Sequence, residues 1–217
     1  MSHQNEKRVI DEQASKFMTQ VLQMYFYKNT ENYECVTDKT RQVQGIDAIF
    51  TFNGKQYQCD EKVAIDWRNL KTFACEVDRL NRNGVLSDGW FTTPGQVNNS
   101  YLFVWLDDPN LGKTSKAASP KVLSDIKTME IALIDKERLK QYFNDRGWTD
   151  EKLLKKASQI RDATKDVKVN MGDLTKYGLK FSYTPYDLNE KPVNVLVPRK
   201  TLIDMSDYTQ KFKIGRG

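Results

Sequence analysis

The spacing of apolar residues predicts a long amphipathic helix near the start of the chain. Between residues 6 and 27, the apolar side chains Ile10, Ala14, Phe17, Val21 and Tyr25 recur at intervals of three and four residues. This interval places them on one face of an α-helix. We therefore expect a helix over 6–27 that packs its apolar face on another part of the protein.

The next pattern alternates with a period of two and predicts a β-hairpin. Residues 43–52 (VQGIDAIFTF) and 55–65 (KQYQCDEKVAI) are rich in β-favouring side chains and are separated by Asn53 and Gly54. Asn-Gly between two alternating runs is the strongest short-range signal for a two-residue hairpin turn. We expect these two runs to form neighbouring antiparallel strands.

Strand and helix patterns are mixed along the rest of the chain. The predicted strands cover 33–37, 71–77, 100–106 and 129–134, with two more between 179 and 198; helices are predicted over 136–146 and 150–163, and a long surface loop over 107–125. This mixture is typical of an α/β protein with a mixed sheet flanked by helices. We expect a single domain over 1–217, in which the second half adds strands to the sheet that the hairpin begins.

Composition restricts the chemistry that this protein can perform. The only histidine is His3, so Ser/His/Asp triads, Cys/His pairs and HExxH zinc sites all lack an essential residue. The three cysteines, Cys35, Cys59 and Cys75, form no CxxC pair and are odd in number. They are predicted to be reduced core residues and not disulfides or zinc ligands. Carboxylates and lysines must therefore carry any catalysis.

Charge is unevenly distributed along the chain, whose formal net charge is +5. Residues 1–110 hold 12 basic and 15 acidic side chains, whereas residues 111–217 hold 22 basic and 14 acidic ones. A basic half favours a polyanionic partner such as nucleic acid, although lysines on exposed helix faces give the same count. No run approaches the roughly 18 apolar residues that span a bilayer, and the polar start does not resemble a signal peptide. We expect a cytoplasmic protein with no membrane partner.

The predicted hairpin brings candidate catalytic residues together. Counting outward from the turn, Asp47 faces Asp60, and Lys62 shares a sheet face with Asp60. Two opposed carboxylates repel each other, and a divalent cation between them would relieve the repulsion. Mg²⁺ suits this position, because it commonly binds proteins through one or two carboxylates. We predict that Asp47 and Asp60 are metal ligands, and that Glu76, from the strand predicted over 71–77, is a further one. Lys62 is predicted to orient the attacking water or to stabilise charge on a phosphate.

Alternative roles for these residues remain open. Asp47, Asp60 and Lys62 could form a surface ion cluster that contributes less than about 1 kcal/mol, and Glu76 could equally form a surface ion pair. Glu61 falls on the apolar face of the hairpin, where an unpaired carboxylate is costly. A β-bulge could therefore shift the register so that Glu61, rather than Asp60, joins Asp47. We favour Asp60, because it keeps an acid and Lys62 in phase.

These residues resemble a known nuclease family. Asp47 in the sequence QGID is followed, after twelve residues, by Asp60-Glu61-Lys62. With the long N-terminal helix, this pattern resembles the core of the PD-(D/E)xK, or restriction-endonuclease-like, superfamily. The resemblance covers about residues 6–110 and leaves a basic C-terminal extension over about 127–217. Ile46 stands where the family pattern has proline.

The resemblance implies a fold, a cofactor and an activity. The implied fold is a three-layer sandwich with a central mixed β-sheet flanked by helices. The implied activity is cleavage of DNA with Mg²⁺ or Mn²⁺, with Asp47 and Asp60 as the acids of the motif and Lys62 as its lysine. Nucleases of this fold often pair to cut both strands, which leaves a homodimer open. The competing hypothesis is a non-enzymatic nucleic-acid-binding or assembly module with a nuclease-like fold and no metal-dependent cleavage.

Overall fold

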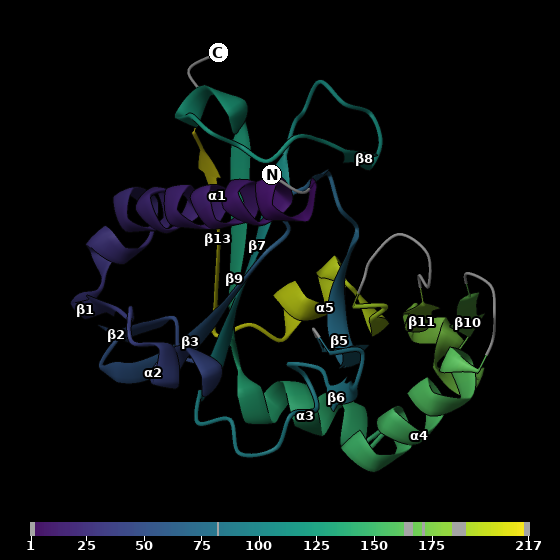
Figure 1. Cartoon of the computed structure of the whole chain (residues 1–217). Coiled ribbons are helices and arrows are strands. Elements are labelled where there is room, and N and C mark those ends of the chain that lie inside the picture. Colours follow the sequence, from purple (N-terminus) through teal and green to yellow (C-terminus); the bar gives the residue numbers. More distant parts are fainter. Residues whose placement is uncertain (1–2, 82, 163–166, 171, 184–189, 215–217) are drawn as a thin grey trace. The chain divides into compact units, whose positions relative to one another are not determined.

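The protein has an α/β architecture and divides into two compact units. The computed structural model describes residues 3–81, 83–162, 167–170, 172–183 and 190–214. The first unit comprises Met1–Lys71, Val97–Asp135 and Ser206–Gly217, and the second comprises Thr72–Gln96 and Lys136–Met205. The chain therefore passes between the units several times. Figure 1 shows the course of the chain.

A mixed six-stranded sheet forms the centre of the first unit. Its strand order is β1-β2-β3-β7-β9-β13, and the strands are β1 (Glu31–Cys35), β2 (Ala48–Phe52), β3 (Lys55–Val63), β7 (Ser100–Asp107), β9 (Thr128–Asp135) and β13 (Tyr208–Lys213). The β3 and β7 strands run parallel, and every other neighbouring pair is antiparallel. The predicted mixed sheet is confirmed, and the second half of the chain adds β9 and β13 to it.

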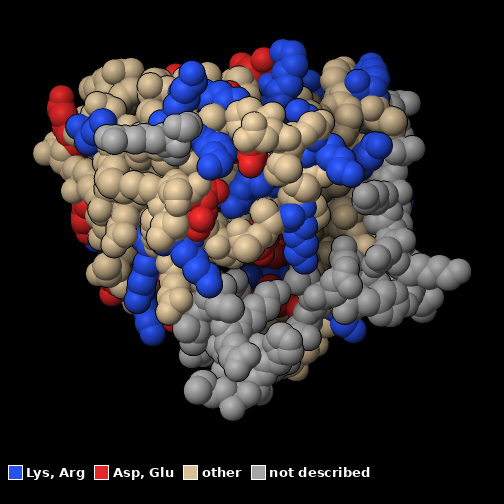
Figure 2. Space-filling view, turned by 90° about the horizontal axis from the view of Figure 1, so that it is seen from above, with Lys and Arg blue, Asp and Glu red and all other residues tan. Residues whose placement is uncertain are grey.

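Short elements complete the first unit. They are η1 (Tyr27–Asn29), α2 (Lys39–Val43), β4 (Trp67–Arg68), β8 (Ser115–Lys116) and η2 (Leu123–Asp125). The β4 and β8 strands pair with each other in a separate two-stranded sheet, and β8 lies within the region 107–125 that was predicted as a long loop. Figure 2 shows the molecule from above, with Lys and Arg side chains at many places on the surface seen from that side.

The β2–β3 hairpin has the predicted turn and register. Asn53 and Gly54 have φ values of 50° and 76°, and Phe52 pairs with Lys55 across the turn. Positive φ at both central residues is the type I′ geometry, whose twist matches that of the flanking strands. The turn therefore fixes which residues of β2 and β3 share a face.

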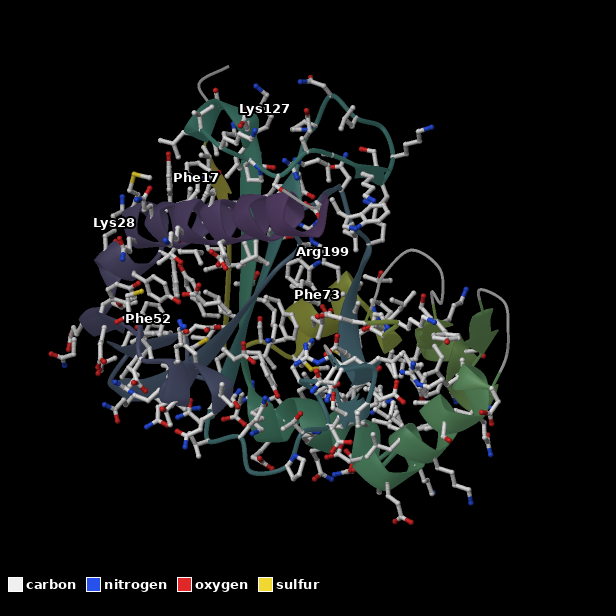
Figure 3. All side chains as sticks on the ribbon, in the orientation of Figure 1. Phe17, Lys28, Phe52, Phe73, Lys127 and Arg199 are labelled. Atoms are coloured by element: carbon white, nitrogen blue, oxygen red, sulfur yellow. The ribbon has the colours of Figure 1, made fainter. Side chains whose placement is uncertain are left out.

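The α1 helix (His3–Tyr25) lies across one face of this sheet (Figure 1). Its buried side chains Met18, Val21 and Leu22 belong to one apolar core with residues of β2, β3, β7 and β9. Phe17 and Phe52, labelled in Figure 3, are partly buried and pack against that core. Each fully buried side chain of this size contributes about 1.5–3 kcal/mol. The predicted amphipathic helix is thus confirmed, and the apolar face of the hairpin is the surface that it covers.

The second unit contains a separate five-stranded antiparallel sheet. Its order is β10-β11-β12-β5-β6, with β10 (Val167–Asn170), β11 (Lys180–Tyr183), β12 (Val193–Pro198), β5 (Thr72–Leu80) and β6 (Leu86–Asp88). Its helices are α3 (Lys136–Asn144), α4 (Asp150–Arg161), η3 (Gly172–Tyr177) and α5 (Arg199–Asp204); α4 and α5 contact β5 and β12. The strand predicted over 71–77 exists, but it belongs to this sheet and not to the sheet of the hairpin.

The structure also shows the start of α4 and the positions of the three cysteines. Thr149 caps α4 by accepting a hydrogen bond from the Lys152 amide. Cys59 and Cys75 are buried free thiols, whereas Cys35 is exposed, so its prediction as a core residue was wrong. It lies on β1, the edge strand of the first sheet. No helix among the described residues is long and apolar enough to cross a membrane.

Gly89, which follows β6, provides a test of packing in the second unit. A Cβ atom at this position would lie 2.3 Å from the backbone oxygen of Glu76, whereas one at Gly112 would meet nothing within 4 Å. We expect Gly89→Ala to lower the free energy of unfolding by about 1–3 kcal/mol or more, because backbone must move. Gly112→Ala should change it by less than about 1 kcal/mol. Urea unfolding of both variants gives the comparison, and equal midpoints would contradict the packing described.

Candidate functional site

A β-bulge at the start of β2 shapes the candidate site. Asp47 directly precedes β2, and its amide donates to the Cys59 carbonyl at 2.8 Å, although Cys59 already pairs with Ala48. Two residues of one strand thus oppose a single residue of the other, which is the arrangement of a β-bulge. The carboxylate of Asp47 takes the place of a backbone acceptor, since its Oδ2 accepts from the Glu61 amide at 2.9 Å. The bulge therefore turns the Asp47 carboxylate back toward β3.

Asp60 and Lys62 form a buried ion pair on β3. Lys62 Nζ lies 2.6 Å from Asp60 Oδ1, and the two side chains are 19% and 4% exposed. Their spacing of two residues places both on the same face of the strand, as predicted. Because Asp60 is almost fully shielded from water, its charge depends on these few neighbours.

Asp47 and Asp60 influence each other electrostatically. Burial raises the pKa of Asp60 to about 7, the nearby Lys62 lowers it, and the charge of Asp47 and its hydrogen bond raise it. Two carboxylates this close share a proton more readily than either would alone. The predicted convergence of Asp47, Asp60 and Lys62 is therefore present, although a bulge and not a regular ladder produces it.

Glu61 points to the opposite face of β3, where α1 covers the sheet. Its Oε1 accepts a hydrogen bond from Tyr27 Oη at 2.6 Å, and Tyr27 is 2% exposed. Burial raises the pKa of Glu61 to about 7, the Tyr27 hydrogen bond lowers it, and the charges of Asp47 and Asp60 raise it. The acid on the apolar face is thus accommodated by a buried tyrosine. The sequence pattern did not indicate that Tyr27 would contact Glu61, because Tyr27 lies in the turn after the helix, where no regular spacing of residues predicts which side chains meet.

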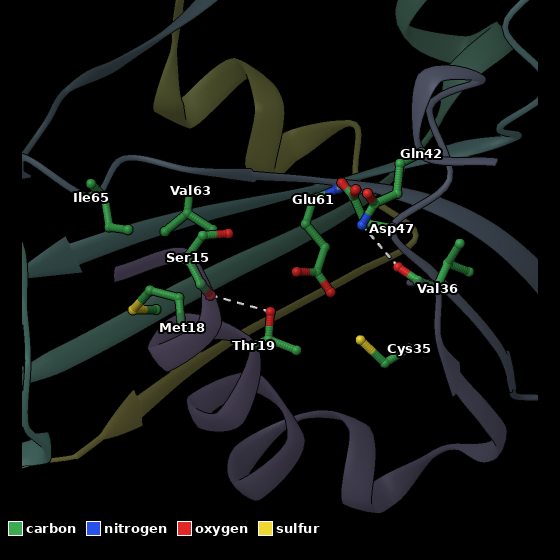
Figure 4. Close-up of a pocket in the computed structure, with 10 residues that line it drawn as sticks. All are labelled: Ser15, Met18, Thr19, Cys35, Val36, Gln42, Asp47, Glu61, Val63 and Ile65. Atoms are coloured by element: carbon green, nitrogen blue, oxygen red, sulfur yellow. Dashed lines mark hydrogen bonds between the residues drawn. The ribbon is translucent and has the colours of Figure 1, made fainter. Parts of the chain in front are cut away.

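A cavity of about 310 Å³ opens on this face, between α1, β1, α2 and β3. Asp47 and Glu61 are its acidic lining residues, and Ser15 and Thr19 of α1 line it as well. Figure 4 shows the Glu61 carboxylate reaching into this space from the strand. Asp60 and Lys62 are not among the lining residues, so the bulged Asp47 connects the cavity with the ion pair on the other face.

The donor set of Asp47 and Asp60 suits a hard divalent cation. Mg²⁺ requires oxygen ligands and commonly binds through one or two carboxylates with water in its other positions. Within the described ranges, no group of three or more His, Cys, Asp and Glu side chains is arranged as a metal site. A cation held by Asp47 and Asp60 would take its remaining ligands from water or substrate.

Glu76, the third predicted metal ligand, is not brought into the same unit. It lies on β5 of the second unit, beside Asn194 of β12, and its Oε1 is 3.6 Å from Nε of Arg79. This contact with Arg79 fits the alternative of an ion pair. Asp47, Asp60 and Lys62 all belong to the first unit and remain the candidate site.

Comparison of the chain with protein-family models, with curated proteins and with solved structures finds no match. The geometry of the site is therefore the basis for assigning a function.

The raised pKa values make the stability of the metal-free protein depend on pH. Folded Asp60 and Glu61 hold protons up to about pH 7, whereas unfolded carboxyl groups release theirs near pH 4. The free energy of unfolding should thus fall, by roughly 1–4 kcal/mol, as pH rises from about 4 to about 7. Asp60→Asn should remove part of this fall. The matched control Asp204→Asn, in an exposed i,i+4 ion pair, should not. Urea unfolding in EDTA across this range tests it, and parallel curves for parent and Asp60→Asn would contradict it.

Proposed function

We propose that this protein is a metal-dependent nuclease of the PD-(D/E)xK type that hydrolyses phosphodiester bonds of DNA. The observation that carries the proposal is the convergence of two carboxyl groups, Asp47 and Asp60, with the ammonium group of Lys62 2.6 Å from Asp60. Acids held this close, with a lysine in contact, are the groups that phosphodiester hydrolysis with a divalent cation needs. The restriction-endonuclease-like fold is part of the proposal. The mixed sheet with its β2–β3 hairpin, and α1 against one face, support it.

Asp47 and Asp60 would hold Mg²⁺ or Mn²⁺, which supplies Lewis-acid polarisation of the phosphate and a more acidic bound water. The side chains themselves have separate tasks. The Glu61 amide fixes the Asp47 carboxylate at 2.9 Å, so its orientation is set before any ligand arrives. Such preorganisation spares the reaction the cost of ordering this group.

Lys62 can stabilise negative charge on the reacting phosphate. Its Nζ is held by Asp60 and its side chain is 19% exposed, so the ammonium group remains partly accessible. With a cation bound to Asp60, Nζ would be positioned to donate to a non-bridging phosphate oxygen. A fixed ammonium group in a largely dehydrated site stabilises developing charge more strongly than one in water.

A second candidate function follows from the burial of Asp60 and its neutralisation by Lys62. Asp60 is 3% exposed, and Lys62 already neutralises it at 2.6 Å. This arrangement also fits a purely structural ion pair in a nucleic-acid-binding module without turnover. Such a module would bind DNA with an affinity that falls with salt but would not cleave it in any metal.

The nuclease proposal predicts cleavage that depends on these residues. Purified protein should degrade DNA in Mg²⁺ or Mn²⁺ and stop in EDTA, and Asp60→Asn or Lys62→Ala should lower kcat at least about 100-fold. The exposed pair Lys200 and Asp204 provides matched controls, since Lys200→Ala and Asp204→Asn should cleave like the parent. Circular dichroism would verify folding. Cleavage by folded Asp60→Asn at the parental rate would refute the assignment.

Metal binding should also appear as a change in thermal stability. At a hundredfold excess over its dissociation constant, Mn²⁺ should add about 2.7 kcal/mol, which raises Tm by about 5–10 °C. Asp60→Asn removes a ligand and also the ion-pair partner of Lys62, so its Tm should be insensitive to Mn²⁺ whatever its own stability in EDTA. Melts of both proteins in EDTA and in millimolar Mn²⁺ make the comparison. Identical responses would show that Asp60 is not a ligand.

A further inference from the structure

An exposed tryptophan lies close in sequence to the candidate site. Trp67, on β4, is 41% exposed and follows Lys62 by five residues. An indole ring in water leaves a large apolar surface uncovered, and tryptophan is among the residues most often used to bind partners. Single exposed apolar residues are common, so its surroundings decide whether this one has a role.

The segments around Trp67 are held rigidly by hydrogen bonds. We call residues 64–71 and 108–121 the Trp67 arm. Within it β4 pairs with β8, and Trp67 lies opposite Lys116. Arg68, which is 5% exposed, donates to the carbonyls of Ile65 and Ala118 at 3.0 and 3.2 Å. Asn69 Nδ2 donates to the Leu111 carbonyl at 2.6 Å. A ring presented from a fixed backbone loses little conformational entropy when it binds a partner.

The charge of the Trp67 arm is positive. The arm contains five Lys and Arg residues and two Asp residues. Both acids are hydrogen-bonded within the arm: Asp66 accepts from Ser119 Oγ at 2.6 Å, and Asp108 accepts from the Asn110 amide at 2.9 Å. The exposed lysines of the arm are Lys71, Lys113, Lys116 and Lys121. An aromatic ring among lysines is complementary to a polyanion that carries flat apolar groups.

We propose that the Trp67 arm binds single-stranded DNA, with a base stacked on Trp67 and phosphates held by Lys113, Lys116 and Lys121. In a duplex the base faces are already stacked on one another, so an indole ring can stack only on an unpaired base. The choice of DNA as the polymer rests on the proposed function. Five residues span at most about 17 Å, which is about five nucleotides at the duplex rise. A strand held on Trp67 therefore reaches Lys62, which lies five residues away.

The proposal is tested by binding measured without cleavage. Fluorescence anisotropy of a labelled dT20 strand in EDTA gives the dissociation constant. Trp67→Ala should raise it about 5- to 100-fold, and Trp67→Phe should retain most of the affinity. Lys116→Gln should reduce the slope of log K against log salt by about 0.7. The controls Leu86→Ala, at a residue 49% exposed, and Lys200→Ala should bind like the parent.

The outcomes separate this proposal from the nuclease assignment. Loss of dT20 affinity in Trp67→Ala supports binding of single-stranded DNA by the Trp67 arm, even if the parent protein cleaves no DNA. Parental affinity for dT20 in Trp67→Ala overturns the proposed role of the Trp67 arm, even if the parent protein cleaves DNA. The proposal is also overturned if a 20-base-pair duplex binds as tightly as dT20, or if Trp67 is needed only for binding to anionic phosphatidylserine vesicles. Urea midpoints of the variants verify that they are folded.

Discussion

The register of the β2–β3 hairpin is the constraint on which the first unit depends. The type I′ turn at Asn53 and Gly54 decides which face each residue of the two strands takes. One face then carries Phe50, Tyr57 and Cys59 into the core beneath α1. The other carries Asp60 and Lys62. A slip of one residue would bury the ion pair under the helix and expose the aromatic rings.

The bulge at Asp47 adds what a regular ladder would not provide. In a regular hairpin, Asp47 and Asp60 would simply face each other as repelling neighbours. In the bulge, the Glu61 amide binds the Asp47 carboxylate, so one backbone donor offsets part of the repulsion. The remaining cost appears in the raised pKa values of Asp60 and Glu61, for which burial is the largest cause.

The two acidic residues of β3, Asp60 and Glu61, each have a partner on their own side of the strand. Tyr27, placed by the turn after α1, satisfies Glu61 on the covered face, while Lys62 satisfies Asp60 on the other. Beyond these residues the chain continues into β4 and presents Trp67 from a backbone fixed by Arg68 and Asn69. The strand that carries the candidate chemistry therefore also leads to the surface that we propose for substrate binding.

The sequence alone determined the features that depend on neighbours along the chain. The helix of α1, the hairpin and its turn, the strand β7 and the helix α4 follow from periodicity and from turn residues, which act over a few positions. The pairing of Asp60 with Lys62 follows from the same alternation. Only the tertiary structure decided what depends on distant residues: that β5 with Glu76 joins a second sheet, that Asp47 leaves the ladder, and that Tyr27 meets Glu61. Strand partners and buried hydrogen bonds depend on how residues far apart in the sequence pack together. A local sequence pattern therefore does not predict them.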